Sequence, residues 1–159
     1  MNELKFVASV AERDLDFVLV EELSVNDEFC DWFTSRLYRE PVFASSIGAW
    51  HSVSDASLGE TDVLYMFKSD EDGRIAVLIE NKIDAGAQPT QAARYQQRGE
   101  KGKQAKDWDD FMTCLVAPSQ YLIGGRQLRQ SGQLRRIDVI LRLPTSQRFA
   151  IFIQSAAHS

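Results

Sequence analysis

The chain has 159 residues, of which 44% are apolar; this is typical of one globular domain and excludes a disordered or fibrous protein. Its net charge of −5 argues against a protein that coats nucleic acid by charge alone, but not against an enzyme that acts on nucleic acid. No apolar run approaches the roughly 18–20 residues of a membrane span, and no secretory signal is recognisable, so we expect a soluble, cytoplasmic protein. Cys30 and Cys114 lie outside any CxxC or Cys/His cluster, which excludes a disulfide framework and argues against structural zinc.

Two helices are expected near the N-terminus. Residues 14–23 are apolar enough for a helix or a buried strand, and we favour a helix because two glutamates close the run. Asn26 or Asp27 can cap a second helix that runs to about Tyr38. Pro41 then prevents this helix from continuing.

A β-hairpin is the clearest local prediction. Residues 61–67 and 74–82 are β-branched and aromatic runs separated by the polar turn sequence KSDEDG, which is typical of two paired strands. The segment before them is extended or looped, and a strand is expected around residues 47–53. The sequence therefore predicts neighbouring strands in the middle of the chain.

The register of this hairpin places polar side chains at its open end. If Lys68 faces Arg74, then Asp62 lies directly opposite Glu80, and the positions between are apolar on both faces of the sheet. We therefore expect central strands that are covered on two sides. Strand alternation places Lys82 on the same face as Glu80.

A helix and a further strand are expected after the hairpin. The helix should cover about residues 88–99, with Gly99 as its stop, and residues 100–110 should form a polar connection. Residues 111–118 should form a buried strand that ends at a proline. This order of elements predicts a small α/β sandwich with helices on both faces of the sheet.

Asp62 and Glu80 are expected to form a pair of facing carboxylates. Such a pair repels strongly at low dielectric unless a cation lies between the two groups. Mg²⁺ removes this cost, because it takes one or two carboxylates and keeps several waters. Lys82 can then orient or deprotonate an attacking water and offset charge that builds on a phosphoryl oxygen. This set of residues suits metal-dependent hydrolysis of phosphodiesters.

The spacing of these residues resembles a known family. Asp62, seventeen intervening residues and then Glu80-Asn81-Lys82 is similar to the motif of the PD-(D/E)XK nuclease superfamily, although Thr61 stands where the name has proline. The resemblance implies an α/β, restriction-endonuclease-like fold with an α-β-β-β-α-β core, in which a mixed central sheet is flanked by helices. It also implies that Asp62, Glu80 and the backbone carbonyl of Asn81 bind Mg²⁺, for which Mn²⁺ can substitute, and that Lys82 activates water.

A second element strengthens this resemblance. Gln91 and Tyr95 fit the Q-x-x-x-Y element of RecB-like members, where it supports the active site and contacts nucleic acid. Helical spacing places both residues on one face. Arg94 and Arg98 begin the nearest basic run, and we expect them to contact backbone phosphates.

The family also implies an acid from the first helix, since a glutamate there often completes the metal shell through water. Glu22 is our choice for this role, with Glu21 as the close alternative. Each of these residues taken singly also fits a solvated helix turn, and the charges at the hairpin end fit a solvated cross-strand cluster. His51 has no second ligand at a useful spacing, so we expect it to be structural or at the surface.

The resemblance implies a divalent-metal-dependent nuclease, for DNA more than RNA, that serves in defence or DNA processing in a bacterium. Many such nucleases form homodimers. The alternative is a catalytically inactive nuclease-fold module that binds nucleic acid or serves in assembly. Metal-dependent thermal stabilisation separates the two hypotheses, because only a competent site should respond.

The charge of the chain is divided unevenly. Residues 1–110 carry 12 basic and 22 acidic side chains, whereas residues 111–159 carry six arginines, no lysine and one acid, Asp138. We therefore predict a nuclease-like domain over residues 1–120 and a basic C-terminal extension over residues 121–159. The extension is either a phosphate-binding segment or an atypical, shortened or frame-shifted end, and we favour the second interpretation.

Overall fold

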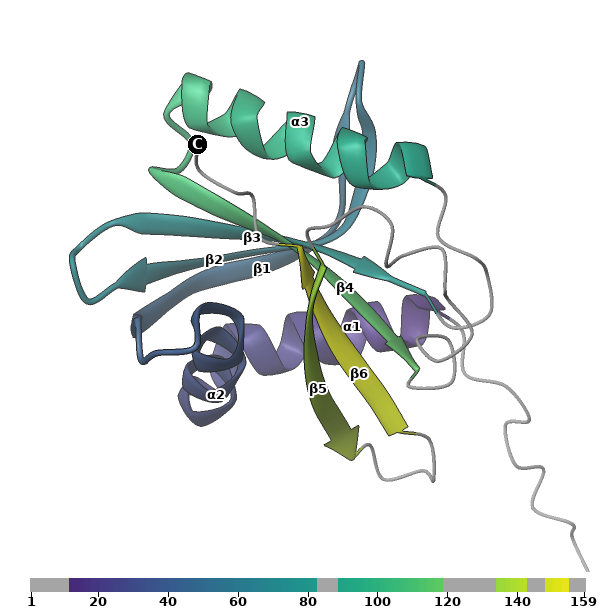
Figure 1. Ribbon diagram of the computed structural model, residues 1–159. Helices are drawn as coiled ribbons and strands as arrows, with labels where there is room; N and C mark the ends of the chain where they lie inside the picture. The colour runs from purple at the N-terminus through teal and green to yellow at the C-terminus, as the bar shows by residue number, and fades with distance from the viewer. Residues whose placement is uncertain (1–11, 83–88, 119–133, 143–147, 155–159) are drawn as a thin grey trace, which may run out of the picture.

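A mixed, six-stranded sheet organises the protein (Figure 1), with strands in the order β1-β2-β3-β4-β6-β5. The computed structural model describes residues 12–82, 89–118, 134–142 and 148–154. The elements are α1 (Glu12–Val25), α2 (Asp27–Tyr38), β1 (Phe43–Asp55), β2 (Gly59–Ser69), β3 (Arg74–Asn81), α3 (Pro89–Ala105), β4 (Asp110–Pro118), β5 (Leu134–Arg142) and β6 (Arg148–Gln154). Helices α1 and α2 cover one face of the sheet and α3 covers the other. This arrangement confirms the predicted α/β core with helices on both faces.

Both N-terminal helices form where they were predicted. The Asn26 side chain caps α2 by accepting a hydrogen bond from the Phe29 backbone N–H over 3.1 Å. The helix ends at Tyr38, because Arg39 takes a left-handed conformation with φ of 61°. The residues that pack these helices against the sheet are Leu15, Leu19, Leu23, Cys30, Phe33 and Leu37.

The β2–β3 hairpin has the predicted register. Its antiparallel pairs run from Lys68 opposite Arg74 to Val63 opposite Ile79. The faces alternate between two clusters: Val63, Tyr65, Phe67, Val77 and Ile79 pack toward α1 and α2, and Leu64, Ala76 and Leu78 pack toward α3. The strands are thus covered on both sides, as expected. Counted from the turn, the last regular pair is Val63 with Ile79, so the pairing stops one position short of Asp62.

Strand β1 is longer than predicted. It occupies the edge of the sheet next to β2, and it covers positions outside the expected strand at residues 47–53. Two register shifts interrupt its pairing with β2, and Ser52 has a positive φ of 54°. An edge strand of this kind is half-exposed and irregular, so its sequence shows little periodicity.

The prediction that Gly99 stops the third helix is wrong. Helix α3 continues to Ala105 and includes half of the segment that was expected to be a polar connection. A Cβ atom at Gly99 would lie 2.1 Å from the Phe111 ring, and one at Gly102 would lie 1.9 Å from the Trp108 ring. Both glycines therefore allow α3 to approach two aromatic rings closely, and this packing outweighs their low helix propensity.

The strand predicted at residues 111–118 is β4, and it pairs in parallel with β3. Strand β6 then pairs antiparallel with β4, and β5 pairs with β6. Two segments of the predicted C-terminal extension thus add strands to the sheet on the β4 side.

Among the described residues, no helix combines the length and the apolar character needed to cross a membrane.

Candidate active site

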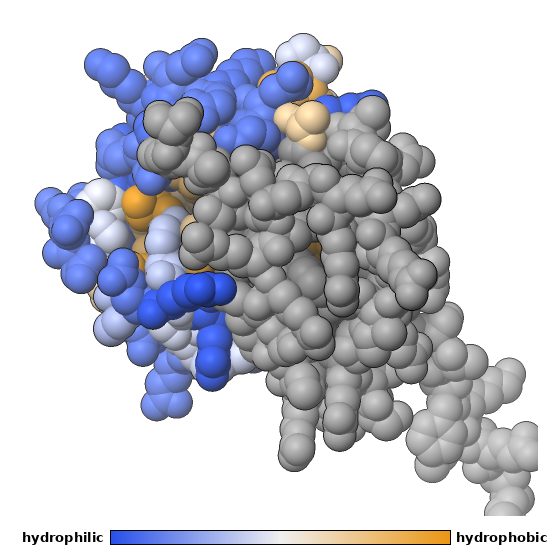
Figure 2. All heavy atoms as spheres, viewed as in Figure 1, coloured by the Kyte–Doolittle hydropathy of each residue, from blue (hydrophilic) through white to orange (hydrophobic). Residues whose placement is uncertain are grey.

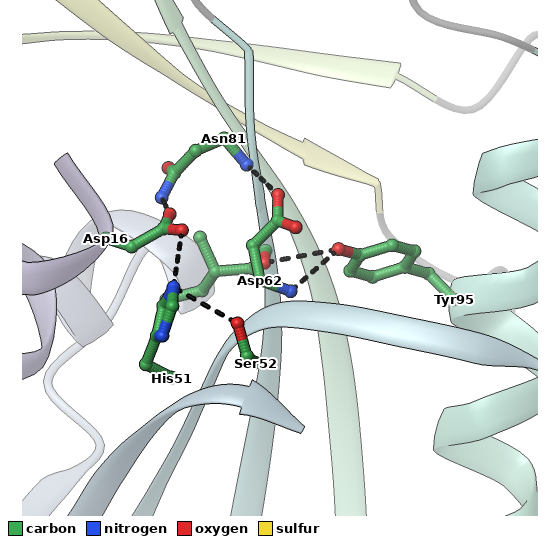
Figure 3. A network of polar contacts seen from close by, with 7 residues as sticks. Asp16, His51, Ser52, Asp62, Asn81 and Tyr95 are labelled. Atoms are coloured by element: carbon green, nitrogen blue, oxygen red, sulfur yellow. Dashed lines mark hydrogen bonds and ion pairs between the residues drawn. The ribbon is translucent and has the colours of Figure 1, made fainter. Parts of the chain in front are cut away.

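Three charged side chains meet at the open end of the β2–β3 hairpin. The Lys82 ammonium lies 3.1 Å from the Glu80 carboxylate, and these side chains are only 15% and 10% exposed. Asp62 faces them from β2, and its carboxylate accepts a hydrogen bond from the Asn81 backbone N–H over 2.9 Å (Figure 3). The structure therefore brings Asp62, Glu80 and Lys82 to the same end of the hairpin, and the predicted pairing of Asp62 with Glu80 lies one position beyond the last regular pair, Val63 with Ile79.

Burial and crowding raise the pKa of Asp62. Burial raises this pKa to about 6, the nearby carboxylates of Glu80 and Asp16 add to the shift, and the hydrogen bond from Asn81 opposes it. For Lys82, burial lowers the pKa, but the hydrogen bond and charge of Glu80 outweigh this effect and hold the pKa above its ordinary value. Lys82 is therefore cationic at neutral pH, within a cluster that carries more acids than bases.

Tyr95 of α3 reaches this end of the sheet. Its hydroxyl accepts a hydrogen bond from the Asp62 backbone N–H over 3.2 Å and donates one to the Ile79 carbonyl over 3.4 Å (Figure 3). Because regular pairing stops at Val63 and Ile79, the phenol joins the two strands where they part. Gln91 lies one helical turn before Tyr95 in α3, and its side chain is outside the described part of the structure.

Asp16 of α1 is a site residue that the sequence reasoning missed. One of its carboxylate oxygens accepts a hydrogen bond from the Asn81 side-chain amide, and the other lies 3.1 Å from His51 Nε2 (Figure 3). The sequence does contain a pattern that indicates a buried acid at this position, because Asp16 stands three residues before Leu19 on the apolar face of α1. An acid in an apolar stripe needs a polar partner, and here Asn81 and His51 supply it.

Asp16 is therefore the acid of α1 that binds Asn81, and the charge of Glu12 in the same helix acts on Lys82, whereas the metal-shell role expected for Glu22 stays a prediction. The Glu22 carboxylate accepts a hydrogen bond from the Asn26 side chain over 2.7 Å, at the C-terminal end of α1. Glu21 is exposed. Asp16 lies six residues earlier, and one residue contributes about 1.5 Å to the length of a helix. Glu22 is thus about 9 Å further along the axis than the acid that contacts Asn81.

The two arginines of α3 differ in their surroundings. Arg94 is exposed, on a helix whose outer side is hydrophilic (Figure 2). Arg98 is buried: its guanidinium lies 4.1 Å from the centre of the Tyr95 ring and donates a hydrogen bond to Thr61 Oγ1 over 2.7 Å. Of these two arginines, Arg94 is therefore the one that is exposed enough to contact backbone phosphate.

The chemistry of the site fits a hard divalent cation. Asp62 and Glu80 are oxygen donors of opposite strands, and β3 ends at Asn81, whose backbone carbonyl was expected as a third donor. Within the described residues, no three His, Cys, Asp or Glu side chains converge on one point. Two carboxylates with a backbone carbonyl match Mg²⁺ or Mn²⁺, since these ions retain several waters.

Comparison with known proteins supports this interpretation. A family model described as the PD-(D/E)XK nuclease superfamily matches residues 5–122, which is most of the chain. Comparisons with curated proteins and with solved structures give no significant match. Proteins of this superfamily generally use divalent metal ions. With the hairpin, the carboxylate pair and the lysine in the family's order, the chain belongs to the PD-(D/E)XK nuclease superfamily.

Proposed function

We propose that the protein is a divalent-metal-dependent nuclease that hydrolyses phosphodiester bonds, in DNA more than in RNA. The observation that carries this proposal is the burial of Asp62, Glu80 and Lys82 together at one end of an otherwise apolar hairpin. Buried charges of this kind cost free energy, and they are retained mainly where a site uses them.

Asp62, Glu80 and the Asn81 backbone carbonyl would hold the metal. Mg²⁺ would supply Lewis-acid stabilisation of negative charge on the phosphoryl oxygens, and Mn²⁺ would substitute for it. The raised pKa of Asp62 supports this role, because burial penalises its charged form and nearby carboxylates add to the penalty, and a bound cation would offset both effects. The negative charge of Asp16 adds to the need for a cation at this point.

Lys82 would act as a fixed positive charge. The Glu80 carboxylate holds the pKa of Lys82 above its ordinary value, so the ammonium is a poor base at neutral pH. An ammonium can instead orient the attacking water through its lone pairs and offset charge on the phosphate during attack. Of the two roles expected for this lysine, we therefore prefer orientation of water over its deprotonation.

The face of α3 would support the site and the substrate. Tyr95 would hold Asp62 and the end of β3 in place through its hydroxyl. Gln91 shares the Q-x-x-x-Y element with it, and we infer a supporting role for Gln91 on this ground alone. Arg94 would contact backbone phosphate, since it is exposed and carries a charge on the same helix. The preference for DNA, and a role in defence or DNA processing, rest on the family resemblance.

Cleavage assays test this proposal directly. The purified protein should be incubated with plasmid, linear duplex, single-stranded DNA and RNA, each with Mg²⁺ and with EDTA. We expect cleavage of at least one DNA substrate with Mg²⁺ and none with EDTA, and we expect Asp62→Ala to remove it.

Thermal unfolding supplies the control. Asp62→Ala should keep a cooperative transition, since Asp62 adds little core volume, but it should lose stabilisation by Mn²⁺. A wild-type protein that cleaves none of the substrates and gains no stability with Mg²⁺ or Mn²⁺ would instead be an inactive nuclease-fold module.

A further inference from the structure

Arg98 is a buried cation without a carboxylate partner among the described residues. The residue is only 8% exposed, and none of the ion pairs between described residues includes it. Its guanidinium contacts are instead neutral: the Thr61 hydroxyl at 2.7 Å, the face of the Tyr95 ring at 4.1 Å and the Arg94 carbonyl at 3.4 Å.

Such a position is costly for the fold. Arginine is almost never fully buried unless it is paired, because a charge leaves water at a high free-energy cost. Hydrogen bonds and a ring face recover only part of this cost. Replacement of a buried charge by an apolar side chain is often neutral or stabilising, which points to the contacts of Arg98 as the reason for its presence.

Those contacts converge on Asp62 from two directions. Thr61, which accepts the hydrogen bond from Arg98, directly precedes Asp62 in β2. Tyr95, whose ring lies under the guanidinium, accepts a hydrogen bond from the Asp62 backbone N–H and donates one to the Ile79 carbonyl. Arg98 thus fixes both the residue before Asp62 and the phenol that holds its backbone.

Asp62 gains from this support because its strand is no longer paired with β3 at this point. Regular β2–β3 pairing ends at Val63 and Ile79. On the other side of β2, the pairs that flank Asp62 are kept, His51 with Val63 and Val53 with Thr61, and between them Ser52 of β1 takes a positive φ of 54°. Backbone that leaves a hydrogen-bonded ladder is free to move unless other groups restrain it.

We propose that Arg98 is a positioning residue of the nuclease site, which holds Asp62 in place through Thr61 and Tyr95. The inference rests on the proposed function, since it assumes that Asp62 binds the metal. A restrained Asp62 presents its carboxylate to the cation without first being ordered. The binding free energy of the metal is then not reduced by the cost of ordering this ligand.

Thr61→Val is the sharpest variant, because it removes one hydroxyl and keeps the shape of the side chain. We expect it to raise the half-saturating Mn²⁺ concentration by at least about tenfold, since a hydrogen bond to a charged group is lost. Thr61→Ser keeps the hydroxyl and should restore the wild-type value. Arg98→Lys should not, because an ammonium lacks the planar donor fork that spans Thr61 and the Tyr95 ring.

Thr34→Val is the matched control. Thr34 is also fully buried and donates its hydroxyl to the Cys30 carbonyl over 2.8 Å, but it lies in α2, away from the site. It should lower thermal stability without changing the Mn²⁺ dependence. A general loss of packing is thereby separated from a loss of positioning.

Two readouts are measured on each full-length variant: the Mn²⁺-dependent shift in the unfolding temperature, and cleavage as a function of Mn²⁺ concentration. Weaker Mn²⁺ binding in Thr61→Val, with wild-type binding in Thr61→Ser and Thr34→Val, supports the inference. Equal Mn²⁺ dependence in Thr61→Val and wild type overturns it, even if the wild-type protein cleaves.

A wild type that binds Mn²⁺ but cleaves nothing contradicts only the proposed function, because the thermal shifts still decide the role of Arg98. A wild type that neither binds nor cleaves overturns both.

Discussion

The two ends of the β2–β3 hairpin carry the same kinds of side chain in opposite surroundings. At the turn, the Lys68 ammonium lies 2.7 Å from the Asp72 carboxylate, and these side chains are 47% and 85% exposed. At the open end, Lys82 lies 3.1 Å from Glu80, and both are largely buried. The two ion pairs differ in burial and hardly at all in chemistry.

Burial decides what each pair can do. Water screens the pair at the turn, and exposed pairs of this kind contribute only about 0–1 kcal/mol to stability. At the open end, removal from water makes every charge expensive, as the raised pKa of Asp62 reports. Under the proposed function, a cation bound at the open end would offset this cost, whereas the turn carries no comparable cost to offset.

The largest contrast should appear in cleavage by two lysine variants. Lys82→Met should lower the cleavage rate about 100- to 1000-fold, because a preorganised charge next to the reacting phosphate is lost. Lys68→Met makes the same replacement at the turn and should stay within about twofold of wild type. Initial rates at saturating Mg²⁺ measure both. Similar losses in the two variants would show that charge, not burial at the site, is what matters.

Glycine substitutions should extend the contrast to stability. Gly102→Ala should destabilise the protein by about 1–3 kcal/mol, since the new Cβ would overlap the Trp108 ring and push α3 from the sheet. Gly73→Ala at the turn should cost less than about 0.5 kcal/mol, because its Cβ would meet only side-chain ends, the Ser69 hydroxyl at 3.3 Å and Ile75 Cδ1 at 3.9 Å. Urea unfolding gives both values. A tolerated Gly102→Ala would mean that α3 is not held closely against Trp108.

Two of the acids of α1, Asp16 and Glu22, allow a finer test. Asp16→Asn should lower cleavage about tenfold, because the charged acceptor of the Asn81 amide is lost. Glu22→Gln should leave cleavage within about twofold, since the Glu22 carboxylate accepts its hydrogen bond from Asn26 at the far end of α1. The comparison needs equal protein and Mg²⁺ concentrations. The reverse order of effects would restore Glu22 as the helix acid of the site.

A last contrast concerns the stability of the metal-free protein. The folded-state pKa of Asp62 is raised from its ordinary 3.8 to about 6, so its charged form destabilises the fold above pH 6 and this cost is absent below about pH 4. Asp62→Asn should therefore raise stability in EDTA by about 1–2 kcal/mol at pH 8, and the gain should vanish at pH 4.

Asp72→Asn at the exposed turn is the control for this pH dependence, and it should change stability by less than about 0.5 kcal/mol. Urea unfolding in EDTA at the two pH values measures both variants. A gain that is equal at pH 4 and pH 8 would rule out the charge of Asp62 as its cause.

The features that could be predicted from the sequence are those that depend on residues close together in the chain. The polar turn and the alternating apolar residues fix the hairpin register, and this register alone placed Asp62 opposite Glu80. Helix caps such as Asn26 were equally legible, because the capping hydrogen bond lies within three residues. The carboxylate pair with its lysine could therefore be proposed before any tertiary contact was known.

Contacts that form only on folding were missed. Gly99 was interpreted as a helix stop because its second role, close approach to Phe111, depends on a strand that follows the helix. Asp16 was overlooked because its partner Asn81 is 65 positions away in the chain. Arg98 was expected to contact phosphate, and no local pattern indicates that a basic residue will be buried against Tyr95 and Thr61.

The wide separation of the site residues has a consequence for the living cell. Asp62 meets Tyr95 across 33 positions and Asn81 meets Asp16 across 65, so the centre requires α1, β2, β3 and α3 at once. During synthesis α3 leaves the ribosome after the other three. A nascent or truncated chain that lacks α3 therefore has no Tyr95 to hold the Asp62 backbone, so the proposed site would be completed only after translation has passed this helix.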